Sequence, residues 1–188
     1  MKMAIRRLRS LAFLGWGDVL LFEHQQHTAP LAKRLVAVQE VTETNVTDAS
    51  WFNTSAEMAA FRDFLKRGDL GFYGYVDRKC IHRSWVKLGP CRINLWRSFS
   101  RRIGSKEAYI HYCKTASEVR GFGVYPLVLD YIARHLKDFY SIQRTYVATN
   151  YTNVASRRGI QKAGFLPVAR YKVLMWWRFP LLVLRKSL

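Results

Sequence analysis

The stretch of sequence that decides the fold is residues 115–126, Thr-Ala-Ser-Glu-Val-Arg-Gly-Phe-Gly-Val-Tyr-Pro, with glycines at positions 121 and 123. Residues 108–115 have the composition of a strand, and residues 125–136 place apolar side chains at helical spacing. Because glycine has no side chain, the backbone of Gly121 and Gly123 can approach a ligand closely. The first turn of the helix leaves backbone amides unpaired, and these attract an anion such as a pyrophosphate. The stretch therefore predicts a strand, an anion-binding turn and a helix.

Towards the C-terminus, the sequence completes a βαβα unit. A strand over residues 145–148 precedes a helix over 153–163, which Gly164 ends, and a strand over 166–175. This order requires a parallel portion in a mixed sheet. Towards the N-terminus, the predicted elements are a strand over 36–41, a helix over 58–66 with N-cap candidates at 53–57, and a hairpin of 71–76 with 80–87. Residues 89–105 are basic and give no prediction of secondary structure.

Composition limits the class of protein. The 188 residues carry 31 Lys+Arg against 13 Asp+Glu, a formal charge of +18, and we expect a single domain over residues 1–188. A hydrophobic content of 49% with 14% aromatics excludes a largely disordered chain. No stretch reaches the roughly 20 apolar residues of a membrane-spanning helix. Three widely spaced cysteines, Cys80, Cys91 and Cys113, argue against a metal site or a disulfide framework and favour a cytoplasmic protein.

Both ends of the chain are basic. Residues 1–30 begin like a signal peptide, but Asp18 interrupts the apolar run, so we expect a basic N-terminal arm or helix. Residues 172–188 form a basic, apolar tail, which suits either a membrane interface or a final strand packed on the sheet. Elsewhere the basic residues fall into small groups, with no dominant block. Such a charge attracts nucleic acid, phosphorylated cofactors, acidic carrier proteins or anionic lipid.

Residues 109–171 resemble the GNAT superfamily of N-acyltransferases, which use acetyl-CoA or related acyl thioesters. The resemblance rests on the glycine turn, on Asn153 with Ser156 three positions later, and on the ending Lys162-Ala163-Gly164-Phe165. It implies an α/β fold with a GNAT-like mixed, mostly antiparallel sheet flanked by helices, and with a βαβα cofactor-binding half. In the preferred register Arg120 begins the loop motif and Tyr125 stands where Gly or Ala is usual. A register two residues earlier would place Glu118 near the pyrophosphate, where a carboxylate is unfavourable.

The resemblance also implies which residues hold the coenzyme. Asn153 and Ser156 would lie near its pantetheine arm, although N-capping of the helix is an equally ordinary role. Arg157, Arg158 and Lys162 would meet its 3′-phosphate or face solvent. The full predicted coenzyme-binding set is Cys113, Thr115, Arg120, Gly121, Phe122, Gly123, Val124, Tyr125, Asn153 and Ser156.

The implied reaction is direct attack of a primary amine on the thioester carbonyl, which strand amides would polarise. Candidate bases are Glu107 and His111, which strand alternation places on one face with Tyr109 and Cys113, and His82 on the hairpin. A strand histidine is more often a hydrogen-bonded or surface residue than a catalytic one. The position where many members carry a tyrosine acid holds Ile160, so Tyr151, Tyr146 or water would protonate the leaving thiolate. Cys113 as an acylated nucleophile is disfavoured, because free cysteines are commonly buried and inert.

Three functions remain open. The first is a CoA-dependent N-acetyltransferase acting on a small-molecule amine, with a nucleotide-linked amino sugar as the leading acceptor. The second is an N-acyl amino acid synthase that takes its acyl group from acyl carrier protein, which would suit the +18 charge and the tail. The third is a catalytically degenerate fold that binds nucleic acid or an anionic membrane.

Overall fold

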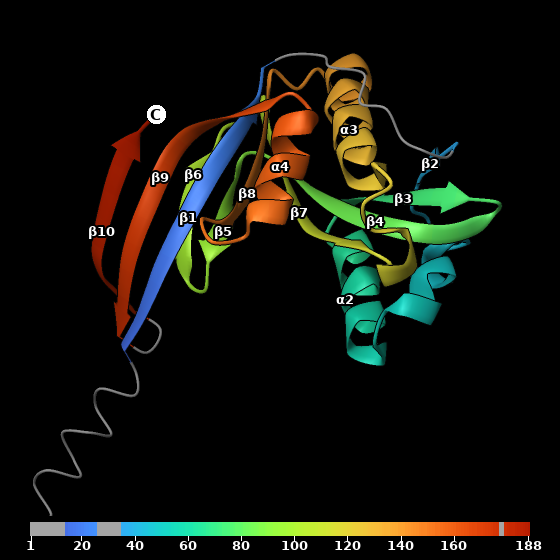
Figure 1. Cartoon of the computed structure of the whole chain (residues 1–188), viewed down its shortest axis with the longest axis horizontal. Coiled ribbons are helices and arrows are strands. Elements are labelled where there is room, and N and C mark those ends of the chain that lie inside the picture. Colours follow the sequence, from blue (N-terminus) through green and yellow to red (C-terminus); the bar gives the residue numbers. More distant parts are fainter. Residues whose placement is uncertain (1–13, 26–34, 177–178) are drawn as a thin grey trace, which may run out of the picture.

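The computed structural model describes residues 14–25, 35–176 and 179–188. Its main element is an eight-stranded sheet in the order β10-β9-β1-β8-β7-β4-β3-β2 (Figure 1). The paired strands are antiparallel except for β7 and β8, which are parallel. The strands are β1 (Leu14–His24), β2 (Ala37–Glu40), β3 (Leu70–Val76), β4 (Lys79–Leu88), β7 (Glu107–Thr115), β8 (Arg144–Asn150), β9 (Phe165–Trp176) and β10 (Phe179–Ser187). The predicted mixed, mostly antiparallel α/β fold is confirmed.

Helices and a hairpin cover parts of both faces of the sheet, and the covered parts form three hydrophobic clusters. On one face lie α3 (Val124–Tyr140) and α4 (Val154–Lys162), preceded by the short 3-10 helix η2 (Ser117–Val119). On the other face, η1 (Val46–Phe52) and α2 (Ser55–Lys66) cover β3 and β4, and the separate hairpin of β5 (Cys91–Trp96) and β6 (Phe99–Ile103) covers β1 and β9. No helix among the described residues is long and apolar enough to cross a membrane.

Local sequence explains most of these elements. Thr54 and Glu57 form a reciprocal capping box that starts α2, and Asn153 caps α4 by accepting a hydrogen bond from the Ser156 amide. Gly68 and Gly164 follow the helix ends with φ of 78° and 79°, in the left-handed region that glycine favours. The predicted strand, turn, helix, strand and helix of the C-terminal half are all present.

The prediction for the N-terminus is wrong within the described residues. Residues 14–24 of the expected basic arm or helix form β1, which lies between β8 and β9. The reason is burial on both faces: Val19 and Leu21 pack under the β5–β6 hairpin, while Leu20 and Phe22 belong to the core beneath α3 and α4. Residues 1–13 of that arm lie outside the described residues.

The hairpin that covers β1 lies within residues 89–105, for which no secondary structure is predicted from sequence. Gly17 makes this packing possible, because a Cβ there would lie 2.4 Å from the Trp96 ring. The expected tail, residues 172–188, consists of the end of β9 and of β10, which pairs with β9 as an edge strand. The tail was expected either to contact a membrane interface or to form a final strand on the sheet, and the structure contains this strand.

Candidate functional site

The site begins where β7 and β8 separate. Their parallel pairing runs from Glu107 opposite Arg144 to Ile110 opposite Val147 and goes no further. Beyond Ile110, the edge of β7 that faces β8 is therefore free of strand partners in the described structure. On its other edge β7 stays paired with β4 as far as Thr115 opposite His82. The backbone amides and carbonyls of this last stretch are thus available to a ligand on one side only.

A bulge in β7 corrects the predicted alternation. Tyr112 has φ of 53°, and the register with β4 shifts at this point. As a result Cys113 packs against the core beneath α3, together with Ala108 and Ile110, and not on the face of His111. The expectation that Glu107, Tyr109, His111 and Cys113 share one face is wrong for Cys113, because the extra residue reverses the order of faces.

A cavity of about 870 Å³ lies against the open part of β7, within the usual size range of small-molecule sites. All ten residues predicted to bind the coenzyme lie in its wall. Lys114, Val119, Pro126, Ala155, Arg158, Gly159 and Lys162 complete the lining. Of these described lining residues, four are basic and none is acidic, so the cavity favours an anionic ligand.

The glycine turn presents backbone amides to this cavity. Gly121 and Gly123 have φ of 83° and 80°, and Gly123 is the N-cap residue of the 17-residue helix α3. The first amides of a helix have no acceptor within the helix, and the helix dipole makes this end positive. The Arg120 side chain donates from Nε to the Thr115 carbonyl at 3.3 Å, which closes the loop between β7 and α3. These features fit a pyrophosphate group.

Tyr125, the departure from the family pattern, is accommodated by Gly159. A Cβ at Gly159 would lie 2.7 Å from the Tyr125 ring, so only glycine at this position of α4 leaves room for the ring. The Tyr125 hydroxyl is hydrogen-bonded with the Ser156 and Cys113 side chains, and burial raises its pKa well above the ordinary value. Burial also raises the pKa of the Cys113 thiol, to about 11, so little thiolate exists at neutral pH.

The alternative acids considered from sequence lie elsewhere. Ile160 is fully buried in the core beneath α3 and α4. Tyr146 donates to Glu107 Oε1 at 3.0 Å, and Tyr151 carries the Arg157 and Arg170 guanidinium groups over its ring. Arg157 thus faces Tyr151 and is absent from the cavity lining, whereas Arg158 and Lys162 are part of it.

Two of the three candidate bases are held by other groups. His82 is fully buried, with Nδ1 2.7 Å from the Thr115 hydroxyl and Nε2 2.9 Å from the Ser84 hydroxyl. Glu107 accepts hydrogen bonds from the Gly104 amide at 2.7 Å and from Tyr146, at the closed end of β7. Both arrangements stabilise the fold and leave no free proton acceptor.

His111 differs from these two. Its Nε2 lies 3.8 Å from Asp69 Oδ2, and both atoms are buried without a hydrogen-bond partner. The ring stacks on Tyr109 with centroids 6.0 Å apart, and Phe64 contacts it edge-on. Burial lowers the pKa of His111 to about 3 and raises that of Asp69. The imidazole is therefore neutral at pH 7, with a ring nitrogen that can accept a proton.

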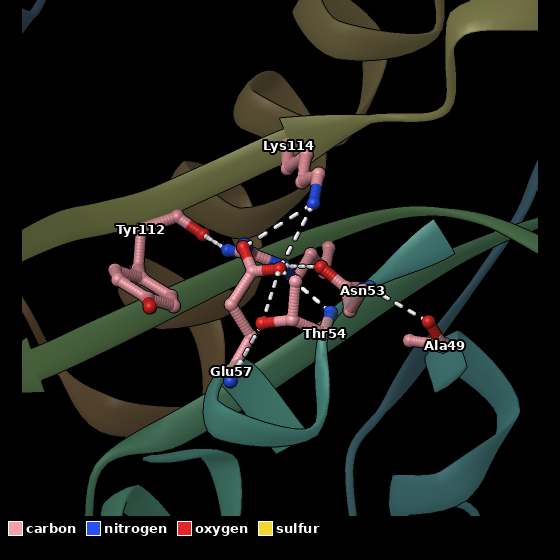
Figure 2. A network of polar contacts seen from close by, with 7 residues as sticks. Ala49, Asn53, Thr54, Glu57, Tyr112 and Lys114 are labelled. Carbon is pink, nitrogen blue, oxygen red and sulfur yellow. Dashed lines mark hydrogen bonds and ion pairs between the residues drawn. The ribbon is translucent and has the colours of Figure 1, made fainter. Parts of the chain in front are cut away.

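A polar network on α2 fixes the bulge from the face of the sheet that carries His111 (Figure 2). The buried Arg83 of β4 donates to the Tyr112 carbonyl, to Asn53 Oδ1 at 2.7 Å and to Glu57 Oε1 at 2.6 Å. Glu57 also binds Lys114 Nζ at 3.0 Å. The Thr54 amide, with Lys114 and Arg83, lowers the pKa of Glu57 to about 2. Sequence gave no signal for this cluster, because its members come from three separate segments.

The lowered pKa values of two buried histidines allow a prediction of how the stability of the protein depends on pH. Burial lowers the pKa of both His82 and His111 from 6.5 to about 3. Between these values the unfolded chain binds protons that the folded chain does not, so stability should fall as the pH drops below about 6.5. Each histidine contributes a slope of about 1.4 kcal/mol per pH unit. Urea unfolding from neutral to mildly acidic pH measures it. His111→Asn should remove about half of the slope; an unchanged slope in this variant would contradict the low pKa of His111.

Comparison with solved structures identifies the fold. An acetyltransferase of the GNAT family from Colwellia psychrerythraea is 17% identical with a TM-score of 0.59, and the match covers 89% of this chain and 58% of that one. This chain thus spans less than two thirds of that relative's length.

Two further matches extend the comparison. A glucosamine N-acetyltransferase region of a fungal multi-domain β-N-acetylglucosaminidase matches at 12% identity and a TM-score of 0.63, covering 92% and 22% of the two chains. The aminoglycoside N-acetyltransferase AAC(6′)-Iy, solved with a bisubstrate analogue of CoA, matches at 13% identity and a TM-score of 0.57, covering 70% and 91%.

Comparison of the sequence alone gives no match. No protein-family profile matches it, and no curated protein does. The resemblance that the motifs implied is therefore confirmed through structure: this chain has the fold of the GNAT acetyltransferases.

Proposed function

We propose that this protein transfers an acyl group from a coenzyme A thioester to a primary amine. The observation that carries the proposal is the single cavity in which the free edge of β7, the two left-handed glycines and four basic side chains meet. Backbone amides and basic groups suit the phosphates of the coenzyme, and the open strand edge suits the amide groups of its arm. A neighbour of the same fold is solved with CoA, which supports this choice of ligand.

Bound acetyl-CoA supplies an acyl carbon, which forms a bond to nitrogen as its bond to sulfur breaks. The ammonium nitrogen loses two protons as it becomes an amide: a base removes the first before attack and it leaves to solvent, and the second balances the proton that the sulfur gains when it leaves as a thiol. We assign removal of the first proton to His111 through a water molecule, because its imidazole is neutral at pH 7 and its Nε2 has no hydrogen-bond partner. The residue lies outside the lining of the cavity, so the water would carry the proton to it. The Asp69 carboxyl, 3.8 Å away, would stabilise the imidazolium that results.

We assign the return of the proton to Tyr125. Tyr125 is part of the cavity wall, beside Ser156 and Cys113, and like any tyrosine whose pKa is not lowered it carries a proton at neutral pH. In this role Tyr125 would replace the tyrosine that many members of the GNAT superfamily carry at the position where this chain has Ile160. The high pKa of Cys113 argues against an acylated cysteine, so direct attack is the simpler route.

For the acceptor we propose an amino sugar, with nucleotide-linked amino sugars first among the compounds to test. Two neighbours of the same fold are named for acetylation of glucosamine and of aminoglycosides, both of which carry amines on sugar rings. These names support a class of acceptor and no individual compound.

The test of the proposed function uses the purified full chain. Acetyl-CoA should raise the melting temperature, and thiol should be released when amino sugars are added. The same assay is repeated with acetyl–acyl carrier protein as the acyl donor. A higher rate with this donor than with acetyl-CoA would favour the alternative function, an N-acyl amino acid synthase. The absence of both a thermal shift at millimolar CoA and thiol release would overturn the proposal.

The role of Tyr125 is tested by Tyr125→Phe. The ring keeps its place against Gly159, so CoA affinity should change little, whereas kcat should fall about 100-fold because the acid is lost. Tyr151→Phe is the matched control, since Tyr151 is outside the cavity lining, and should keep the activity of the wild type. Equal kcat values for Tyr125→Phe and the wild type would contradict the assignment.

A further inference from the structure

The fold gathers positive charge that the sequence spreads out. Residues 91–103 and 165–188 contain nine of the 31 basic residues and none of the 13 acidic ones. In the structure β1, β9 and β10 are neighbours in the sheet, and the β5–β6 hairpin packs on β1 and β9. Figure 1 shows these elements together at one end of the molecule, and this end is therefore rich in basic residues.

The same end exposes apolar side chains on one face of the sheet. Strand register places Trp16 opposite Leu174, Trp176 opposite Phe179, and Leu174 opposite Leu182, so all of these point to the side of the sheet that carries α4. Leu184 lies on this face as well, opposite Lys172. We call this set the outer sheet face: Trp16, Leu174, Trp176, Phe179, Leu182 and Leu184.

Nothing in the described structure covers the outer sheet face. Trp16, Trp176 and Phe179 are 54%, 50% and 66% exposed. Further along β1, Leu20 and Phe22 point to the same side and are buried beneath the helices. The helices thus cover one part of this face and leave the other part to solvent. Monomeric proteins rarely leave such a contiguous apolar area exposed without a partner.

The charges beside these apolar groups identify the kind of partner. Lys172 and Lys186 point to the same side, opposite Leu184 and Arg170, and the Asp18 carboxylate there is already paired with Arg170. Tryptophan and leucine enter the boundary between headgroups and acyl chains, while lysine reaches the phosphates of anionic lipids. We propose that the outer sheet face docks on an anionic phospholipid bilayer.

Two other partners fit this chemistry less well. A nucleic acid would neutralise the charge, but phosphates and sugars would leave the leucine and phenylalanine side chains exposed to water. A second copy would cover the apolar groups, but it would bring two surfaces of the same positive sign together. The bilayer satisfies both features at once, and this inference does not depend on the proposed acyltransferase function.

The experiment is co-sedimentation of the full chain with vesicles. We expect binding to vesicles of phosphatidylcholine and phosphatidylglycerol in equal parts, little binding to phosphatidylcholine alone, and weaker binding as salt is added. Trp176→Ser with Phe179→Ser, and separately Lys172→Glu with Lys186→Glu, should each lower the partition coefficient roughly tenfold or more.

Matched controls separate docking from general effects. Leu166→Ser removes an apolar side chain that is 48% exposed at the opposite end of β9, and Lys137→Glu reverses an exposed charge on α3; both should bind vesicles like the wild type. The circular dichroism spectrum and the melting temperature of every variant check that the fold is intact. The proposal is overturned by absence of binding to anionic vesicles, by equal losses in the controls, by RNA binding in place of vesicle binding, or by a dimer that buries this face.

Discussion

Replacement of Gly123 by valine should abolish binding of the coenzyme at micromolar concentration. Gly123 has φ of 80°, which a β-branched residue adopts only with strain, and its relaxation would turn the first amides of α3 away from the cavity. Loss of two hydrogen bonds to a charged group, at about 1.5 kcal/mol each, weakens binding roughly 100-fold. Isothermal titration with CoA measures the change directly.

Gly68 offers the matched control for this substitution. It follows α2 with φ of 78°, and a Cβ there would meet no atom within 4 Å. Valine in the left-handed region costs about 1–2 kcal/mol of stability or somewhat more, and we expect this cost for both Gly68→Val and Gly123→Val. Gly68→Val should leave the affinity for CoA unchanged. If both variants bind CoA equally well, the anion site is elsewhere.

Replacement of Glu57 by glutamine should cause the largest loss of stability. Glu57 is the acidic partner of Arg83, whose side chain is only 3% exposed, at 2.6 Å. Glutamine keeps the shape and leaves a buried cation without a counter-charge, which costs about 3–5 kcal/mol. Because Arg83 also holds the Tyr112 carbonyl at the bulge, kcat/KM should fall as the free edge of β7 shifts. Chemical denaturation and steady-state kinetics measure the two effects.

A double-mutant cycle keeps this prediction falsifiable. Glu57→Gln combined with Arg83→Met removes both charges and fills most of the volume, so it should be more stable than Glu57→Gln alone. Glu43→Gln, at an exposed loop position, is the control for the chemistry of the substitution and should change stability by less than about 0.5 kcal/mol. A double variant with strictly additive losses would show that the ion pair carries no coupling.

The residues that line the candidate site could be predicted from local sequence, whereas the environments of its candidate catalytic bases could not. The glycine turn and the cap of α4 are decided by residues close in the chain, and so the ten predicted residues lie around one cavity. The environments of His82, Glu107 and His111 depend on residues up to 42 positions away, such as Asp69 beside His111. No pattern within a single strand separates a histidine held by two hydroxyls from one that faces a carboxyl.

Bulges and long-range packing account for the remaining errors. Strand alternation failed at Cys113 because one residue, Tyr112, adopts φ of 53° while its carbonyl is held by Arg83 from β4. The N-terminal strand was missed because residues 14–24 are apolar on both faces and carry a basic segment before them, which resembles an arm or a helix as much as a central strand.

The sequence alone determined the βαβα half, the glycine turn and the class of fold, because propensity, capping and glycine conformation act over a few residues. Only the tertiary structure decided that Tyr125 lies against Gly159, that Arg83 pairs with Glu57, and that apolar side chains from β1, β9 and β10 meet at the outer sheet face. The physical reason is that burial and charge pairing depend on distance in space, which the order of residues along the chain does not specify.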